Sequence, residues 1–304
     1  MARQLLEAQA MTDYANRSAR GRAPDDDEAT LRNRLESDRE RDRRRGALGL
    51  VDLAADGGLA PATVGALAER ATGDGSEDVR QFAVEALGLA ASSGDAEPAH
   101  EAIRAALSDD AEWVRSEAVV AQSRAEPGNE EPLRTALEDD SGWVRRNAVI
   151  ALSKTGAASQ ELLIERIKND PHSGVREYAA DYLREYADEV EDAVRILAAV
   201  LARDPEAFVR AKAATSLGDL GTDRAEAVLE RHGLNDRSDD VRRSAKRALA
   251  TARGVDPDQI DAGLEEGAAP GGGPGSRREQ QGPGPARGPA GSIDGLTQGQ
   301  RDRR

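Results

Sequence analysis

The sequence has 304 residues and a net charge of −15, from 57 acidic and 42 basic residues. It contains no Cys, which excludes disulfides, thiolate metal sites and cysteine nucleophiles. The longest uninterrupted apolar run, residues 196–202, is far shorter than the roughly 20 residues of a membrane-spanning helix. Residues 1–11 lack the apolar core of a signal peptide. A cytoplasmic location is therefore expected.

The basic residues are unusual because four are Lys and the remaining 38 are Arg. An acidic surface poor in Lys is typical of proteins that stay soluble in concentrated salt, as in a salt-loving archaeon. Codon bias in a GC-rich genome produces the same composition, so the sequence leaves both origins open. In either case the acidic chain argues against nonspecific nucleic-acid binding, which needs clustered cations to displace counterions.

Residues 1–27 are expected to form a short helix followed by a polar connector. Gly21 and Pro24 break any helix in the connector. The first helical pair, within residues 28–55, is degenerate: Glu40 stands where later units have Val, as expected of a polar terminal cap. Arginines at 39–45 alternate with acidic residues, which predicts ion pairs rather than a nucleic-acid patch. The helix at 1–16 would carry four large apolar side chains: Leu5, Leu6, Met11 and Tyr14.

A pattern exemplified by SEDVRQFAVEALGLAA at residues 76–91 then recurs along the chain. Its Val-Arg pairs begin at residues 79, 114, 144, 175, 209 and 241, a spacing of 30 to 35 residues that is the signature of a solenoid. Counting from the Val as position 0, positions 0, 4, 7, 8 and 11 share one helical face. Residues 28–253 are therefore predicted to form an all-α solenoid of about seven helical hairpins. Residues 254–304 should add one short helix and a disordered tail rich in Gly, Pro and Arg.

The repeated D-x-x-V-R-x-x-A-x-x-A-L pattern resembles HEAT repeats, in particular the short HEAT-like repeats of phycobilisome lyases. The resemblance covers about residues 28–253 and implies an armadillo-like superhelix whose second helices line the concave side. It also implies a structural role for the Arg that follows each Val, which typically bonds to acidic or carbonyl groups of a neighbouring repeat. The six matching residues are Arg80, Arg115, Arg145, Arg176, Arg210 and Arg242.

No catalytic constellation stands out in the sequence. Deoxyhypusine hydroxylase is similar in fold but holds iron with several His-Glu pairs, whereas this chain has one, His100-Glu101, and its other histidines have no Glu after them. A non-enzymatic scaffold without a metal or cofactor is therefore expected. A lyase-like enzyme acting on a bilin or tetrapyrrole remains the alternative that the resemblance leaves open.

Positions 2 and 6 of each second helix lie opposite the core face and should form the concave surface. This surface is predicted to have an apolar centre and charged ends, suited to an extended or helical peptide. Alternatively, neighbouring helices partly cover Val120 and Ile150. The candidate partner-binding residues are Val120, Ile150, Arg146, Glu85, Glu177, Asp181, Arg243 and Arg247.

Five of the repeats each contribute one aromatic residue to one flank of the second helices. These residues could contact a partner, because binding hot spots favour Trp and Tyr. The favoured interpretation is that they seal the seams between repeats, because their positions lie nearer the core face. They occupy position −1 or position 3: Phe82, Trp113, Trp143, Tyr178 and Phe208.

Overall fold

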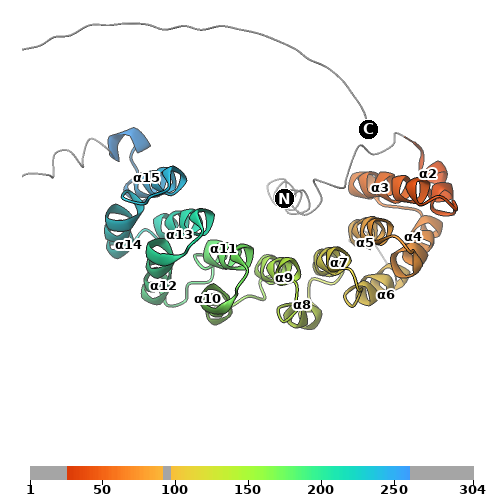
Figure 1. The fold of residues 1–304 in the computed structure, drawn as a ribbon, viewed down its shortest axis with the longest axis horizontal. Helices are drawn as coiled ribbons and strands as arrows, with labels where there is room; N and C mark the ends of the chain where they lie inside the picture. The colour runs from red at the N-terminus through yellow and green to blue at the C-terminus, as the bar shows by residue number, and fades with distance from the viewer. Residues whose placement is uncertain (1–25, 92–96, 261–304) are drawn as a thin grey trace, which may run out of the picture.

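The computed structural model describes residues 26–91 and 97–260 of the chain. All regular structure in these residues is helical, and the helices form seven successive hairpins stacked side by side in an arch (Figure 1). The predicted all-α solenoid is therefore confirmed. The helix predicted at residues 1–16 and the tail from residue 267 lie outside the described residues.

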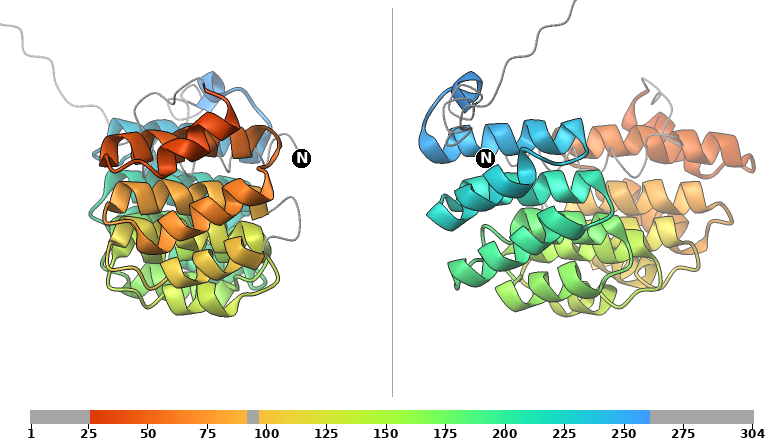
Figure 2. Two further views of the ribbon diagram at one scale, coloured as in Figure 1. Left: turned by 90° about the vertical axis from the view of Figure 1, so that its right-hand side faces the viewer. Right: turned by 60° about the vertical axis from the view of Figure 1, so that its left-hand side comes forward.

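The hairpins form two layers, which Figure 1 shows as the outer and inner rims of the arch and Figure 2 shows from two further sides. The first helices form the outer layer: α2 (Glu28–Leu35), α4 (Pro61–Gly73), α6 (Glu97–Ala106), α8 (Glu131–Ala136), α10 (Gln160–Asn169), α12 (Val190–Arg203) and α14 (Asp223–Val228), which continues into the π-helical turn η1 (Leu229–Gly233). The second helices form the inner layer: α3 (Glu40–Gly57), α5 (Glu77–Ala91), α7 (Glu112–Ala125), α9 (Gly142–Thr155), α11 (Ser173–Tyr182), α13 (Ala207–Leu220) and α15 (Asp239–Arg253).

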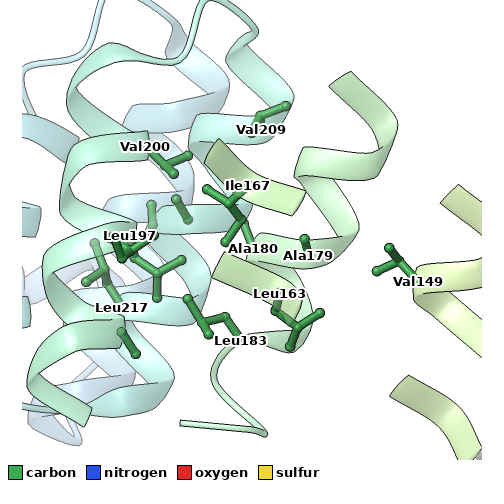
Figure 3. Packing of buried hydrophobic residues seen from close by; sticks show 14 of the residues in the cluster. Val149, Leu163, Ile167, Ala179, Ala180, Leu183, Leu197, Val200, Val209 and Leu217 are labelled. Carbon is green, nitrogen blue, oxygen red and sulfur yellow. The ribbon is translucent and has the colours of Figure 1, made fainter. Parts of the chain in front are cut away.

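The apolar core lies between the two layers. Leu163 and Ile167 of α10 belong to one continuous cluster with Leu197 of α12 and Leu217 of α13 (Figure 3). Burying such a side chain contributes roughly 1.5–3 kcal/mol relative to leaving it exposed. The Val at position 0 is buried in all six units that match the pattern: Val79, Val114, Val144, Val175, Val209 and Val241.

Small residues let neighbouring inner helices approach closely. A Cβ added to Gly88 of α5 would lie 2.6 Å from the Cβ of Ala121 in α7. The same contact recurs between α13 and α15, where a Cβ on Gly218 would lie 2.5 Å from the Cβ of Ala248. In both cases position 9 of one inner helix meets position 7 of the next, so a larger side chain would push the two helices apart.

The structure shifts the register of the first hairpin by two residues. Arg43 bonds to Asp74 in the way that Arg80 bonds to Asp109, so Arg43 is the equivalent of Arg80. Asp42, not Glu40, then stands at the Val position. Sequence comparison missed this register because the run of small and apolar residues at 46–51 matches the later repeats nearly as well in either alignment.

Candidate partner-binding surface

A ladder of ion pairs links the turns of successive hairpins. In one rung, the Nε and Nη2 atoms of Arg145 each donate to a carboxylate oxygen of Asp170 in the next hairpin, both at 2.8 Å. The Nη1 atom of Arg145 donates to the carbonyl of Asp139 at 2.8 Å. Six rungs have this form: Arg43–Asp74, Arg80–Asp109, Arg115–Asp139, Arg145–Asp170, Arg176–Asp204 and Arg210–Asp236.

Arg242 differs from the other predicted ladder residues because it lies in the last hairpin of the described array. It donates to the carbonyl of Asp236 and to the carboxylate of Asp239, both in its own repeat. Arg43, which sequence comparison did not assign to the ladder, supplies the first rung instead. The ladder therefore runs from the first described hairpin to the turn of the last one.

Five of the ladder carboxylates, Asp74, Asp109, Asp139, Asp170 and Asp236, have a lowered pKa. Burial acts to raise the pKa of Asp170, but the hydrogen bonds from Arg145 and from the His172 N–H, with the charge of Arg145, outweigh burial and lower it. The same balance lowers the pKa of Asp109 and of Asp139. These groups are satisfied within the protein, which marks the ladder as a structural element rather than a binding site.

An aromatic row lies at the N-terminal ends of α7, α9 and α11. The ring centroids of Trp113 and Trp143 are 5.7 Å apart, and Trp143 meets the ring of His172 edge-on at 4.9 Å. Sequence reasoning missed His172, which lies at position −3 of its unit. A possible signal was the Gly at position −1 there, Gly174, where three of the other units carry an aromatic residue. Gly142 makes room for the imidazole, because a Cβ on it would lie 2.4 Å from the ring.

An open cavity of about 350 Å³ adjoins this row, and we call it the aromatic pocket. Its lining residues are Trp143, Arg146, His172, Ser173, Gly174, Glu177, Tyr178 and Phe208. The guanidinium of Arg146 lies 4.5 Å from the centroid of the Tyr178 ring and donates to the Tyr178 hydroxyl at 3.0 Å. Phe208 is 43% exposed, so the pocket presents an apolar side chain to solvent beside a fixed cation.

Glu177 brings a carboxyl group to the aromatic pocket. Burial raises the pKa of Glu177, while the charges of Lys212 and Arg146 act in the opposite direction. Its neighbour Asp181 is held by an ion pair to Lys212 at 2.9 Å. The pocket therefore combines aromatic walls with one cation and one acid.

Phe82 does not share the surroundings of the other flank aromatics. It is fully buried in the core of the N-terminal hairpins, with the guanidinium of Arg44 5.3 Å from its ring centroid. Trp113, Trp143 and Tyr178 are half-buried, and Phe208 is exposed. The predicted flank thus divides into a core residue at one end and an accessible set around the aromatic pocket.

The two apolar residues at the predicted centre of the concave surface are buried in the structure. Val120 is 5% exposed and Ile150 is 0% exposed, so neither side chain offers an open contact. Glu85 and Arg146 are buried as well. Both apolar side chains are buried, and neither belongs to the two core clusters of the described helices.

The C-terminal half of the same surface is open. Arg243 and Arg247 of α15 are exposed, and Arg243 pairs with Asp240 of its own helix. Glu177 and Asp181 of α11 are half-buried. The accessible part of the predicted site therefore extends from the aromatic pocket to the cationic inner face of α15.

Two further features of the described helices bear on the site. None of these helices is long and apolar enough to cross a membrane. Within residues 26–91 and 97–260 there is no group of three or more His, Asp or Glu side chains that could hold a metal ion. The His-Glu pair at residues 100–101 thus has no further ligands grouped with it in this part of the chain.

Comparison with known proteins finds a similar type of repeat in part of the chain. The family model for HEAT repeats matches residues 120–184 and again residues 160–250. Residues 120–250 are therefore similar to HEAT repeats. The family model describes HEAT repeats in general, so it does not support the finer resemblance to lyase-type repeats. A search of the curated proteins finds no match to the chain.

Solved structures agree on the HEAT-repeat fold. The Escherichia coli protein YibA is 19% identical with a TM-score of 0.53, over 73% of this chain and 80% of that one. Yeast importin-β (Kap95p) is 14% identical with a TM-score of 0.53, over 79% of this chain but 37% of its own length. Human deoxyhypusine hydroxylase is 24% identical, but its TM-score of 0.36 is too low to support an argument. At these identities the likeness concerns the fold alone.

Proposed function

We propose that this chain is a non-enzymatic HEAT-repeat scaffold that binds a protein or peptide segment on its concave side. The aromatic pocket is the observation that carries this proposal. Trp143, Tyr178 and Phe208 offer rigid apolar surface, and aromatic side chains in partly desolvated pockets dominate the energetics of many interfaces. The pocket opens at the ends of three successive inner helices, where an extended segment can cross from one repeat to the next.

The charges around the pocket suggest the chemistry of the partner. A volume of about 350 Å³ suits one large apolar side chain as an anchor. Beyond the pocket, Arg243 and Arg247 present an exposed cationic face on α15. We therefore expect a segment with an apolar anchor followed by acidic residues, since complementary charge favours encounter and fixes direction.

The proposal is tested by replacing the exposed anchor-contacting residue in the full chain. Phe208→Asp places a charge at the mouth of the aromatic pocket and should reduce capture of the bound protein by about tenfold or more. Val190→Asp is the matched control, because Val190 is 37% exposed but begins α12 in the outer layer. Quantitative affinity capture from cell extract, with circular dichroism as the check of folding, gives the readout. Equal capture by both variants and the wild type would refute the proposal.

A further inference from the structure

The cavity between the turns of the last two hairpins differs in charge from its counterpart near the start of the array. Both lie beside a ladder rung, and their volumes are about 390 Å³ at the rung of Arg80 and about 340 Å³ at the rung of Arg210. The first is lined by one Arg and three Asp, but the second, which we call the basic cavity, by four Arg and two Asp. The charged lining residues of the basic cavity are Arg203, Asp204, Arg210, Arg231, Asp236 and Arg237.

The ladder accounts for both acidic residues of the basic cavity. Asp236 pairs with Arg210, and Asp204 pairs with Arg176 of the preceding rung, each at 2.8 Å. Both carboxylates therefore already have a cation, and the other arginines add positive charge that the lining of the cavity does not neutralise. These residues are Arg203, Arg231 and Arg237, and all three are exposed.

Arg203 and Arg237 stand at two positions where the other ladder turns carry no basic residue. The residue directly before the ladder Asp is Arg203 here and, in the other turns, Gly73, Ser108, Glu138, Asn169 and Asn235. The residue directly after it is Arg237 here and, in the other turns, Gly75, Asp110, Asp140, Pro171 and Pro205. Because stacked repeats share one backbone arrangement, the scaffold itself does not require Arg at either position.

The π-helical turn η1 brings Arg231 and His232 to the basic cavity. Such turns are rare and occur frequently at functional sites. The side-chain amide of Asn235 donates to two carbonyl groups of this turn, at 3.0 and 3.3 Å. Gly233 lets the turn lie close to α15, since a Cβ there would be 2.5 Å from the Cβ of Ala245. The backbone that carries Arg231 is thus held in place from both sides.

Arg237 is held across the same junction. Its Nη2 atom donates to the carbonyl of Pro205, in the turn of the preceding hairpin, at 3.1 Å. A guanidinium has five N–H donors, so others remain for a ligand. His232 is half-buried and adds an imidazole N–H to the lining. Besides the two ladder carboxylates, no acidic side chain of the described residues lines the basic cavity.

We propose that the basic cavity binds a phosphoryl group, carried either by a small phosphate ester or by a phosphorylated side chain. Near neutral pH this group has close to two negative charges and three acceptor oxygens, and clusters of Arg recognise it through charge-assisted hydrogen bonds. A carboxylate offers one charge and two oxygens, so it would leave more of the positive charge unmatched. A nucleic acid is a poorer ligand, because the chain has a net charge of −15 and the cavity is confined to one junction.

Titration of the full chain with inorganic phosphate, followed by phosphorus NMR at about 0.15 M salt, tests the site. We expect saturable binding by the wild type. Arg231→Gln and Arg237→Gln should each weaken it by about tenfold, because each removes a charged hydrogen-bond donor. Arg104→Gln is the matched control and should bind phosphate as the wild type does. Arg104 precedes the ladder residue Asp109 by five residues, as Arg231 precedes Asp236, and its side chain is 43% exposed.

Three outcomes overturn the proposal. It fails if the wild type binds no phosphate, or if Arg231→Gln and Arg237→Gln bind phosphate as tightly as Arg104→Gln. It also fails if succinate displaces phosphate at equal concentration, since the cavity would then recognise carboxylates. The guanidinium of Arg231 has no ion-pair partner among the described residues, so Arg231→Gln should leave the melting temperature unchanged and report on the site alone.

A short neutral peptide with one phosphoserine separates the two sources of the phosphoryl group. Tighter binding of this peptide than of inorganic phosphate supports the site and assigns it to a phosphorylated protein. Equal binding of the two supports the site and assigns it to a small phosphate ester. The aromatic pocket takes no part in these titrations, so their failure would leave the proposed function standing.

Discussion

The ladder rung between Arg145 and Asp170 should be among the strongest polar contributions to stability. The guanidinium donates to both carboxylate oxygens of Asp170 and to two backbone carbonyls in the preceding turn. Arg145→Met keeps an unbranched apolar stem but removes all four hydrogen bonds. Asp170, whose side chain is 2% exposed, then keeps the backbone N–H of His172 as a hydrogen-bond donor.

The magnitude follows from the burial of the two partners. Removing one member of a buried ion pair costs about 3–5 kcal/mol, since the other charge stays buried. The Arg145 side chain is 12% exposed, so water can reach the edge of the rung and the lower end, about 3 kcal/mol, is expected. For an array of this length such a loss lowers the melting temperature by about 6–12 °C.

The matched control is Arg195→Met on the outer helix α12. Arg195 pairs with Asp192 at 3.1 Å, but both side chains are more than half exposed, so less than about 1 kcal/mol should be lost. Urea unfolding should be followed by circular dichroism for the whole array and by tryptophan fluorescence for α7 and α9, because repeat arrays need not unfold in one step. If Arg145→Met costs no more than Arg195→Met, the reasoning about the ladder is wrong.

Three further predictions concern stability. Folding lowers the pKa of Asp109, Asp139 and Asp170, so their contribution to stability is complete above the ordinary value of about 3.9 and is lost as the pH falls through the folded values. The unfolding free energies of wild type and Arg145→Met should therefore converge in acid titrations as the pH falls below about 4. Gly218→Ala should lower the free energy of unfolding by about 1–3 kcal/mol, because the added methyl group clashes with Ala248. Gly65→Ala, which lies in open space within α4, should instead raise the melting temperature. Asn147→Ala removes two buried hydrogen bonds to α7 and should cost about 1–3 kcal/mol in urea unfolding; an unchanged midpoint would contradict this.

The solenoid was predictable because its determinants are local and repeated. Each unit carries the Val at position 0 and small apolar residues at helical spacing, and each turn carries acidic residues. The register of the first hairpin was not predictable in this way. Arg43 is identified by its contact with Asp74, and that contact exists only once the hairpins stack.

The candidate surface was harder to predict from the sequence, because the exposure of a side chain depends on what lies against it. Helical periodicity placed Val120 and Ile150 opposite the core face, but it could not indicate that both are covered. His172 was overlooked because it reaches the aromatic row from position −3, across the space left by Gly142. Phe208 belongs to the flank that the favoured interpretation placed in the seams between repeats, yet its side chain is 43% exposed.

The ladder has a consequence for how such an array can change length. Every rung pairs an Arg with an Asp, and the Arg of one hairpin donates to the Asp in the turn of the next hairpin. Excision of residues 115–144 would join Val114 to Arg145, whose carboxylate acceptor, Asp170, remains in place one turn further on. A whole hairpin can thus be lost or duplicated without leaving an unmatched charge at the junction, so the molecule is built to be shortened or extended in units.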